Sequence, residues 1–210
     1  MSSGVPTVFV VDDDASVLKG LSRLLRSAGW QAATYESPEA FLSGYDPSAP
    51  GCLVLDVAMP GVDGLELQRR LAEAGCPLPI VFITGHGDVA TSVRAMRAGA
   101  LNFLTKPVNE DELLAAVGEA VDKDRFARRA QADMAVVRDR LGTLTPRERE
   151  VLARVVAGKL NKQIAGELGT VEKTVKVHRA HVMEKMGARS LAELARMAER
   201  LGIPAPQAER

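Results

Sequence analysis

Cysteine and histidine are scarce in this sequence, which has two cysteines and three histidines among 210 residues. Cys52 and Cys76 lie 24 positions apart, without CxxC spacing or a neighbouring histidine. We therefore interpret them as small buried or half-buried thiols, not as a metal or redox pair. A basic N-terminal segment and a long apolar run are also missing, because the first apolar stretch stops at Asp12. These absences argue against a signal peptide and a membrane span, so we expect a cytoplasmic protein with no membrane partner.

The formal net charge of zero hides an uneven distribution of charge. Residues 1–124 contain 9 basic and 17 acidic residues, a net charge of −8, whereas residues 141–210 contain 13 basic and 8 acidic residues, a net charge of +5. Residues 125–140, with 5 basic and 2 acidic residues, carry the remaining +3. An acidic first half and a basic second half indicate different partners, and nucleic acid is a natural partner for the second half.

The first half alternates short β-branched or apolar runs with segments of helical periodicity. The runs are Thr7–Val11, Gln31–Tyr35, Cys52–Asp56, Pro79–Thr84 and Leu101–Thr105. This order predicts an α/β fold with a five-stranded parallel sheet that is doubly wound by helices. In such a sheet the carboxyl ends of the strands share one edge, where ligands bind.

After Pro107 the periodicity becomes purely helical. We interpret the charged, alanine-rich residues 125–141 as a helical linker between a first domain, 1–124, and a small all-α domain, 142–210. Thr145, Pro146 and Glu148 predict a helix start with a capping box. Further helices are expected at about 162–167, 171–186 and 190–201.

Polar and charged side chains lie at the ends of four predicted strands. Asp12 and Asp13 follow the first strand, Asp56 ends the third, Thr84 ends the fourth, and Lys106 follows the fifth. The three aspartates would form an all-oxygen cluster whose negative charge a hard divalent ion, Mg²⁺, would balance. Lys106 adds a cation, and Thr84 adds a hydroxyl donor. These groups suit phosphoryl transfer onto a carboxylate, with one aspartate attacking in line.

The same residues resemble the receiver domains of two-component response regulators over roughly residues 5–125. The matching features are the acidic pair after the first strand, LDVAMPGVDG around Asp56, Thr84, and Lys106 followed by Pro107. TGHGDV, from Thr84 to Val89, further resembles the FixJ-type subgroup. The resemblance implies a flavodoxin-like fold in which Asp56 accepts a phosphoryl group from a partner histidine kinase.

A ligand set for Mg²⁺ also follows from this resemblance. Asp13 and Asp56 would bind the ion directly, together with the backbone carbonyl of Ala58. Asp12 would bind it mainly through water.

The resemblance also implies a conformational switch. Thr84 would move toward the phosphoryl group and the aromatic ring of Phe103 would turn inward, which would reshape the face near the fourth helix and fifth strand. In the family the peptide bond between the residues that correspond to Lys106 and Pro107 is cis.

Other residues in these loops have simpler interpretations. Asp14 is expected to be solvated or to cap the first helix. His86 lies between two glycines and has nothing to pair with, so a backbone-shaping or interface role is expected rather than acid-base chemistry.

A rival interpretation is a phosphatase of the haloacid-dehalogenase type. DDDASV resembles the first motif of that family, with Asp12 as nucleophile and Asp14 as acid-base partner, and Thr84 and Lys106 would serve as its second and third motifs. However, no further strand ending in an acidic pair follows Lys106, and nothing resembles a cap domain. The apolar strand that ends in Asp56 would also be left unexplained.

NKQIAGELGTVEKTVKVHRAHVMEKM contains a helix, a glycine-bearing turn and a basic second helix, the order of a helix-turn-helix. The outer face of the second helix presents Lys173, Lys176, Val177, Arg179 and Ala180. Apolar and small side chains between cations suit a DNA major groove, whereas cations alone would give affinity without sequence preference. The alternative is a helical interaction domain whose lysines are merely solvated.

Residues 142–202 closely resemble the LuxR/NarL-type DNA-binding domain, from LTPREREVL through TVKVHRAHVMEKMGARS. By that resemblance the last helix would provide a dimer contact, Lys176, Val177 and Ala180 would meet base edges, and Lys162, Thr174 and Arg179 would meet phosphates. One departure is Val171, which stands where relatives usually have a serine at the start of the recognition helix. This helix would lack a cap unless Thr170 shifts its start by one residue.

These features lead us to expect a response regulator of the FixJ/NarL type, with no enzymatic activity beyond its own phosphorylation and dephosphorylation. Phosphorylation would promote homodimerisation and binding to promoter DNA, and the family resemblance favours activation of transcription together with RNA polymerase. The alternative is a receiver that serves only as a phosphate sink, which would need no recognition helix.

Overall fold

The computed structural model describes residues 5–85 and 89–203. The chain forms two compact units, Met1–Arg128 and Arg129–Arg210, and each is described by itself. His86 lies outside the described residues. Among the described residues, no helix combines the length and the apolar character that crossing a membrane requires.

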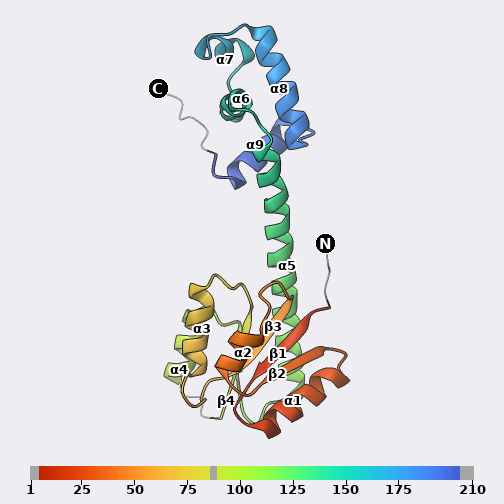
Figure 1. Ribbon diagram of the computed structural model, residues 1–210, viewed down its shortest axis with the longest axis vertical. Helices are drawn as coiled ribbons and strands as arrows, with labels where there is room; N and C mark the ends of the chain where they lie inside the picture. The colour runs from red at the N-terminus through yellow and green to blue at the C-terminus, as the bar shows by residue number, and fades with distance from the viewer. Residues whose placement is uncertain (1–4, 86–88, 204–210) are drawn as a thin grey trace. The chain divides into compact units, whose positions relative to one another are not determined.

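The first unit contains a parallel sheet of five strands (Figure 1). These are β1 (Thr7–Val11), β2 (Gln31–Tyr35), β3 (Gly51–Asp56), β4 (Ile80–Thr84) and β5 (Asn102–Thr105), in the spatial order β2-β1-β3-β4-β5. Every residue of β3 and β4 is buried, which explains why these two strands consist almost entirely of apolar residues.

Helices cover both faces of this sheet and confirm the predicted doubly wound α/β fold (Figure 1). On one face lie α1 (Ala15–Ser27) and the first part of α5 (Glu110–Gly142); on the other lie α2 (Pro38–Gly44), α3 (Gly64–Glu73) and α4 (Val89–Arg97). Alternate residues of a strand point to opposite faces. Val8 and Val10 therefore join the core under α1 and α5, while Phe9 and Val11 join the core under α2, α3 and α4.

Helices are the only regular elements in the described part of the second unit, as predicted. It consists of the end of α5 with α6 (Pro146–Val156), α7 (Asn161–Glu167), α8 (Glu172–Met186) and α9 (Leu191–Arg200). These helices enclose a core that includes Val137, Leu152, Ile164, Val182 and Leu194. The predicted capping box opens α6: the Glu148 N–H donates to the Thr145 hydroxyl, and the Thr145 N–H donates to Glu148 Oε2 at 2.8 Å.

Candidate phosphoryl and nucleic-acid sites

Three carboxylates meet where β1 and β3 end. Val11 of β1 pairs with Leu55 of β3, so Asp12 and Asp56, the next residue of each strand, lie side by side. Asp13 joins them, and one oxygen from each of the three aspartates lies within 4.8 Å of the others. Asp12 and Asp56 are buried, whereas Asp13 is exposed. The structure thus brings together the three carboxylates that the sequence analysis selected.

Lys106 compensates part of this negative charge. Its N–H donates to the Thr84 carbonyl at 2.7 Å, and its bond to Pro107 is cis, as the family resemblance implied. Its Nζ lies 2.7 Å from Asp12 Oδ2 and 3.3 Å from Asp56 Oδ1. Burial by itself would lower the pKa of Lys106, but the hydrogen bond to Asp12 and the charge of Asp56 outweigh it, so this pKa is raised. Lys106 therefore stays charged inside the cluster.

Asp56 is less well compensated than Asp12. Burial, the largest effect, and the charge of Asp12 raise the pKa of Asp56, while Lys106 opposes them only in part. Within the described residues, the buried Asp56 Oδ1 has no hydrogen-bond partner. A buried carboxylate oxygen that makes no hydrogen bond and faces the Lys106 ammonium group at 3.3 Å, beside two further carboxylates, fits the all-oxygen ligand set of a hard divalent cation such as Mg²⁺.

The two predicted switch residues lie on β4 and β5. Thr84 ends β4, next to β3, and its side chain is buried. Phe103 is partly buried, and the centre of its ring lies 6.2 Å from that of Phe82. Phe103 packs against the core under α2, α3 and α4. A change at Phe103 would therefore alter the packing on the α4 side of the sheet.

The loop after Asp56 is sterically constrained. Ala58 is exposed in this loop. The Val57 N–H donates to the Ile83 carbonyl at 3.1 Å, and the Val57 carbonyl accepts from Gly64 N at 3.0 Å. A Cβ on Gly64 would lie 2.2 Å from the Asp56 carbonyl oxygen, so a larger residue would displace the backbone of Asp56. The sequence motif includes this glycine, but only the structure supplies the reason for it.

Asp14 stands outside the carboxylate cluster. Its carboxylate caps α1, accepting from Ser16 N at 2.7 Å and Val17 N at 3.4 Å. The hydrogen bonds from Ser16 lower the pKa of Asp14. The predicted capping role is confirmed, and the phosphatase interpretation is left without its acid-base partner.

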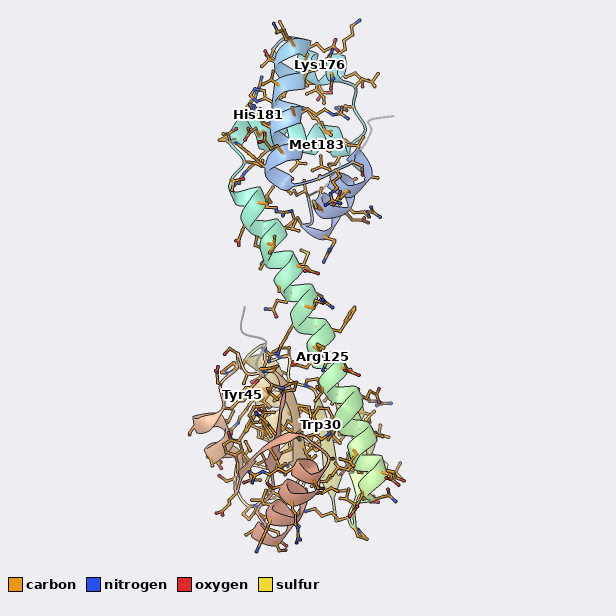
Figure 2. The ribbon with its side chains drawn as sticks, turned by 90° about the vertical axis from the view of Figure 1, so that its right-hand side faces the viewer. Trp30, Tyr45, Arg125, Lys176, His181 and Met183 are labelled. Carbon is orange, nitrogen blue, oxygen red and sulfur yellow. The ribbon has the colours of Figure 1, made fainter. Side chains whose placement is uncertain are left out.

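The helix-turn-helix has the predicted inner and outer faces. Ile164, Ala165, Val175, Val182 and Met186 are buried between the helices. The predicted DNA-contacting residues Lys162, Lys173, Lys176, Val177 and Ala180 are exposed, and Thr174 and Arg179 are partly buried. Figure 2 shows Lys176 near the first turns of α8 and His181 further along this helix.

Two of the predicted DNA-contacting residues also pair within the unit. Arg179 Nη1 donates to Asn161 Oδ1 at 3.2 Å, which ties α8 to the first residue of α7. Lys176 Nζ lies 3.6 Å from Glu172 Oε1. The side chains of Lys176 and Arg179 on the outer face of α8 are thus partly oriented by neighbouring groups.

The entrance of α8 has no side-chain cap, as expected from Val171. This residue occupies the N-cap position with φ −96° and ψ 151°, and Thr170 does not shift the start of the helix. A serine cap replaced by an apolar residue costs on the order of 1 kcal/mol of helix stability. Helix α7 likewise begins after an apolar residue, Leu160, whose N–H donates to Gln163 Oε1 at 2.7 Å.

Glu148 has a wider role than the sequence analysis gave it. Beyond the capping box, its Oε2 accepts from Lys185 Nζ at 2.7 Å, and its Oε1 lies 3.6 Å from His181 Nδ1. The hydrogen bonds from Lys185 and from the Thr145 N–H lower the pKa of Glu148 to about 2. No local pattern joins α6 to residues so far along the chain, so sequence reasoning could not find this contact.

Comparison with known proteins adds independent findings. Residues 8–118 match the family model of the response regulator receiver domain, and residues 142–198 match that of bacterial regulatory proteins of the luxR family. Nodulation protein W of Bradyrhizobium diazoefficiens is 48% identical over 96% of this chain and 89% of its own length, and the transcriptional regulatory protein FixJ of that species is 42% identical over 93% and 96%. The solved structure of response regulator StyR has a TM-score of 0.85 and 48% identity, covering 94% of this chain and 100% of that one.

Proposed function

The chain belongs to the two-component response regulators of the FixJ type, with a receiver domain and a luxR-family DNA-binding domain, and on this premise we propose that phosphorylation of Asp56 controls its binding to promoter DNA. The phosphoryl donor is a partner histidine kinase. The phosphorylated protein forms a homodimer, binds promoter DNA in the cytoplasm and activates transcription with RNA polymerase. The observation that carries this proposal is the buried Asp56 Oδ1, which makes no hydrogen bond within the described residues and lies next to Asp12, Asp13 and, at 3.3 Å, the Lys106 ammonium group.

The chemistry follows from these groups. A carboxylate oxygen of Asp56 attacks the phosphorus, the P–N bond to the kinase histidine breaks, and its electron pair stays on the imidazole nitrogen. Lys106, held by Asp12, balances negative charge at the acceptor. Asp12, Asp13, Asp56 and the carbonyl of Ala58 would hold Mg²⁺, which supplies further positive charge to the transferring group when bound. Beyond this reaction and the later hydrolysis of the acyl phosphate by water, which releases inorganic phosphate, the protein is not an enzyme.

In this proposal Thr84 and Phe103 carry the conformational change from the phosphorylated Asp56 to the surface of the receiver. We propose that the Thr84 hydroxyl moves toward the phosphoryl group and that Phe103 turns inward, shifting the face formed by α4 and β5. Exposed Val89, Val93 and Met96 on α4 make this face apolar. It is our candidate for the surface that pairs two phosphorylated receivers, because exposed apolar patches mark association sites.

The DNA is bound by the second unit. In this proposal Lys176, Val177 and Ala180 meet base edges in the major groove, while Lys162, Thr174 and Arg179 meet phosphates and Lys173 adds positive charge. Residues 125–141 serve as the linker between receiver 1–124 and DNA-binding domain 142–210. The exposure of the cations and small residues on one side of the helix-turn-helix supports this assignment.

The test is intact mass measured with and without acetyl phosphate and Mg²⁺, with light scattering on the same samples. We expect the wild type to gain one phosphoryl group and to dimerise, Asp56→Ala to do neither, and Asp14→Ala, which removes a carboxylate outside the cluster, to behave as wild type. A phosphoryl group on Asp12 would support the phosphatase interpretation instead. A phosphorylated protein that selects no DNA sequence would point to a phosphate sink.

A further inference from the structure

Val171 is an exposed apolar residue at a position where the local structure favours a hydroxyl or carboxyl cap. It precedes the first residue of α8, its side chain is 64% exposed, and it makes no side-chain hydrogen bond. Within the described residues, it belongs to no hydrophobic core. The residue therefore weakens the helix without strengthening the packing of the second unit. Places where a sequence breaks such a local rule without a structural gain are expected to be functional sites.

The surroundings of Val171 indicate what it contacts. The N-terminal residues of a recognition helix are the ones that reach base edges in the major groove. Lys173 and Lys176, which follow within the first turns of α8, are exposed and basic. Val177, on the predicted base-reading face, is a second apolar side chain that is 48% exposed. The two valines thus lie beside exposed lysines and the exposed Glu172, which pairs with Lys176, and such a charged setting favours DNA over an apolar protein surface as the occupant.

The chemistry of valine restricts the base that it can read. A serine at this position would cap the helix or bind a phosphate, and neither contact depends strongly on sequence. Valine can neither donate nor accept a hydrogen bond. The major groove offers it one apolar group, the C5 methyl of thymine.

We propose that Val171 is a specificity-determining residue that contacts a thymine methyl group in each half-site of the operator. This inference rests on the proposed binding of promoter DNA and adds to it one base that the protein prefers. Valine at this position leaves the start of the recognition helix without a side-chain cap, but it gives the protein a preference for one base.

The experiment uses the full chain, treated with acetyl phosphate and Mg²⁺, to select its sites from a random DNA library. Each thymine of the selected site is then replaced by deoxyuridine, which removes only the methyl group. At one thymine per half-site, the wild type should lose affinity by about fourfold, the effect of burying one methyl group. Val171→Ser should bind the thymine and deoxyuridine sites equally well at that position.

Two further variants separate base reading from capping. Val171→Thr keeps a methyl group and adds a hydroxyl, so it should retain the preference for thymine and melt at a higher temperature than the wild type. Leu160→Ser, which alters the other exposed apolar helix start, should leave the preference at that thymine unchanged. Because serine and threonine both favour the cap, these variants are expected to fold.

Two outcomes would overturn the inference. One is a wild type that loses no affinity with any deoxyuridine; another is a Val171→Ser variant that keeps the wild-type preference. If that variant also fails to dimerise, Val171 is a protein contact. If no sequence is enriched from the library, the proposed DNA-binding function fails, and this result is distinct from the other two.

Discussion

At the scale of single residues, Lys106 compensates part of the negative charge of the three clustered carboxylates. Its ammonium group lies 2.7 Å from one aspartate and 3.3 Å from another. A metal ion bound by the same aspartates would be repelled by this ammonium group, because both charges are positive. In the proposed reaction Lys106 would therefore favour phosphoryl transfer but oppose metal binding.

Replacing Lys106 with methionine should separate these two effects. We expect Lys106→Met to bind Mg²⁺ at least about tenfold more tightly, a modest part of the roughly 4 kcal/mol between unit charges 4 Å apart near a protein surface. Its phosphorylation by acetyl phosphate should become slower, since the acceptor site loses a fixed cation. Calorimetric titration with Mg²⁺ and intact mass over time measure both effects. Lys123→Met, an exposed lysine of the same unit, is the control, and weaker or unchanged Mg²⁺ binding by Lys106→Met would contradict this account.

Glu148 gives the second unit a predictable response to acid. Its pKa in the folded state, about 2, lies below the value of roughly 4.3 for an unperturbed glutamate. The folded state thus favours the ionised form of Glu148. The contribution of this carboxylate to the stability of the second unit is therefore present above about pH 4.5 and is lost as the pH falls toward 2. Methyl NMR signals from the core of the second unit should lose their native positions in this window.

The variant Glu148→Gln tests the origin of this response. Glutamine can still complete the capping box, but it has no charge for Lys185. We expect the variant to be about 1–3 kcal/mol less stable at neutral pH. Between about pH 4.5 and 2 it should lose less stability than the wild type, and the remaining pH dependence should include Glu167, whose pKa is also lowered by its hydrogen bonds from Lys159 and Arg154. Glu150→Gln, which changes an exposed glutamate on the same helix, should titrate as the wild type. Parallel titration of Glu148→Gln and the wild type would show that another group is responsible.

At the scale of elements, helix α5 is fastened to the first unit by an acid and a base four residues apart. The buried carboxylate of Asp124 accepts from Gly51 N at 3.0 Å and from Arg128 Nε at 2.8 Å. The Arg128 guanidinium also donates to the carbonyls of Ser48 and Ala49, at 3.0 and 2.8 Å. Arg128 is the last residue of the first unit. This anchor therefore coincides with the point where contacts to the first unit end.

Removing this anchor should loosen α5. Arg128→Met leaves the Asp124 carboxylate buried without its cation, so we expect a loss of about 3 kcal/mol in the free energy of unfolding of the first unit. Hydrogen exchange should also accelerate in the turns of α5 around Arg128. Arg125→Met is a matched control, because Arg125 is exposed on the same helix and its ion pair is with the exposed Asp122 (Figure 2). The loss of Arg125 should cost less than about 1 kcal/mol. Equal effects of the two substitutions would show that the buried pair does not anchor the helix.

The elements that could be predicted from the sequence are those determined by patterns among residues that are close together in the chain. The five strands were found to within one residue at their starts, because β-branched runs and helical periods alternate regularly. Asp12, Asp13, Asp56 and Lys106 could be placed together because the carboxyl ends of parallel strands share an edge. Asp124 could not be identified, since the charged pattern around it is typical of a solvated helix face. Its carboxylate is bound by the N–H of Gly51, the first residue of β3, which is more than 70 residues away in the sequence.

At the scale of the whole molecule, the two units carry opposite charge. Residues 1–128 contain 11 basic and 17 acidic residues, and residues 129–210 contain 16 and 10. DNA is attracted to the second unit and repelled by the first. We therefore expect the unphosphorylated receiver to reduce the affinity of the second unit for DNA.

The fragment that tests this prediction is defined by the packing of the second unit. Val137 lies in its core, and Arg140 Nη1 donates to the Met186 carbonyl at 3.1 Å, so a fragment that begins at residue 141 would lose both contacts. The fragment 129–210 keeps them. We expect it to bind DNA at least about fivefold more tightly than the unphosphorylated full chain, the lower end of typical coupling between sites. The difference should shrink as salt rises, because charges more than about 8 Å apart are screened at physiological ionic strength. If adding residues 1–128 as a separate chain does not weaken DNA binding by the fragment, the effect of the receiver requires the covalent connection. Equal DNA affinities of the fragment and the full chain in matched salt would refute the prediction that the receiver reduces DNA binding.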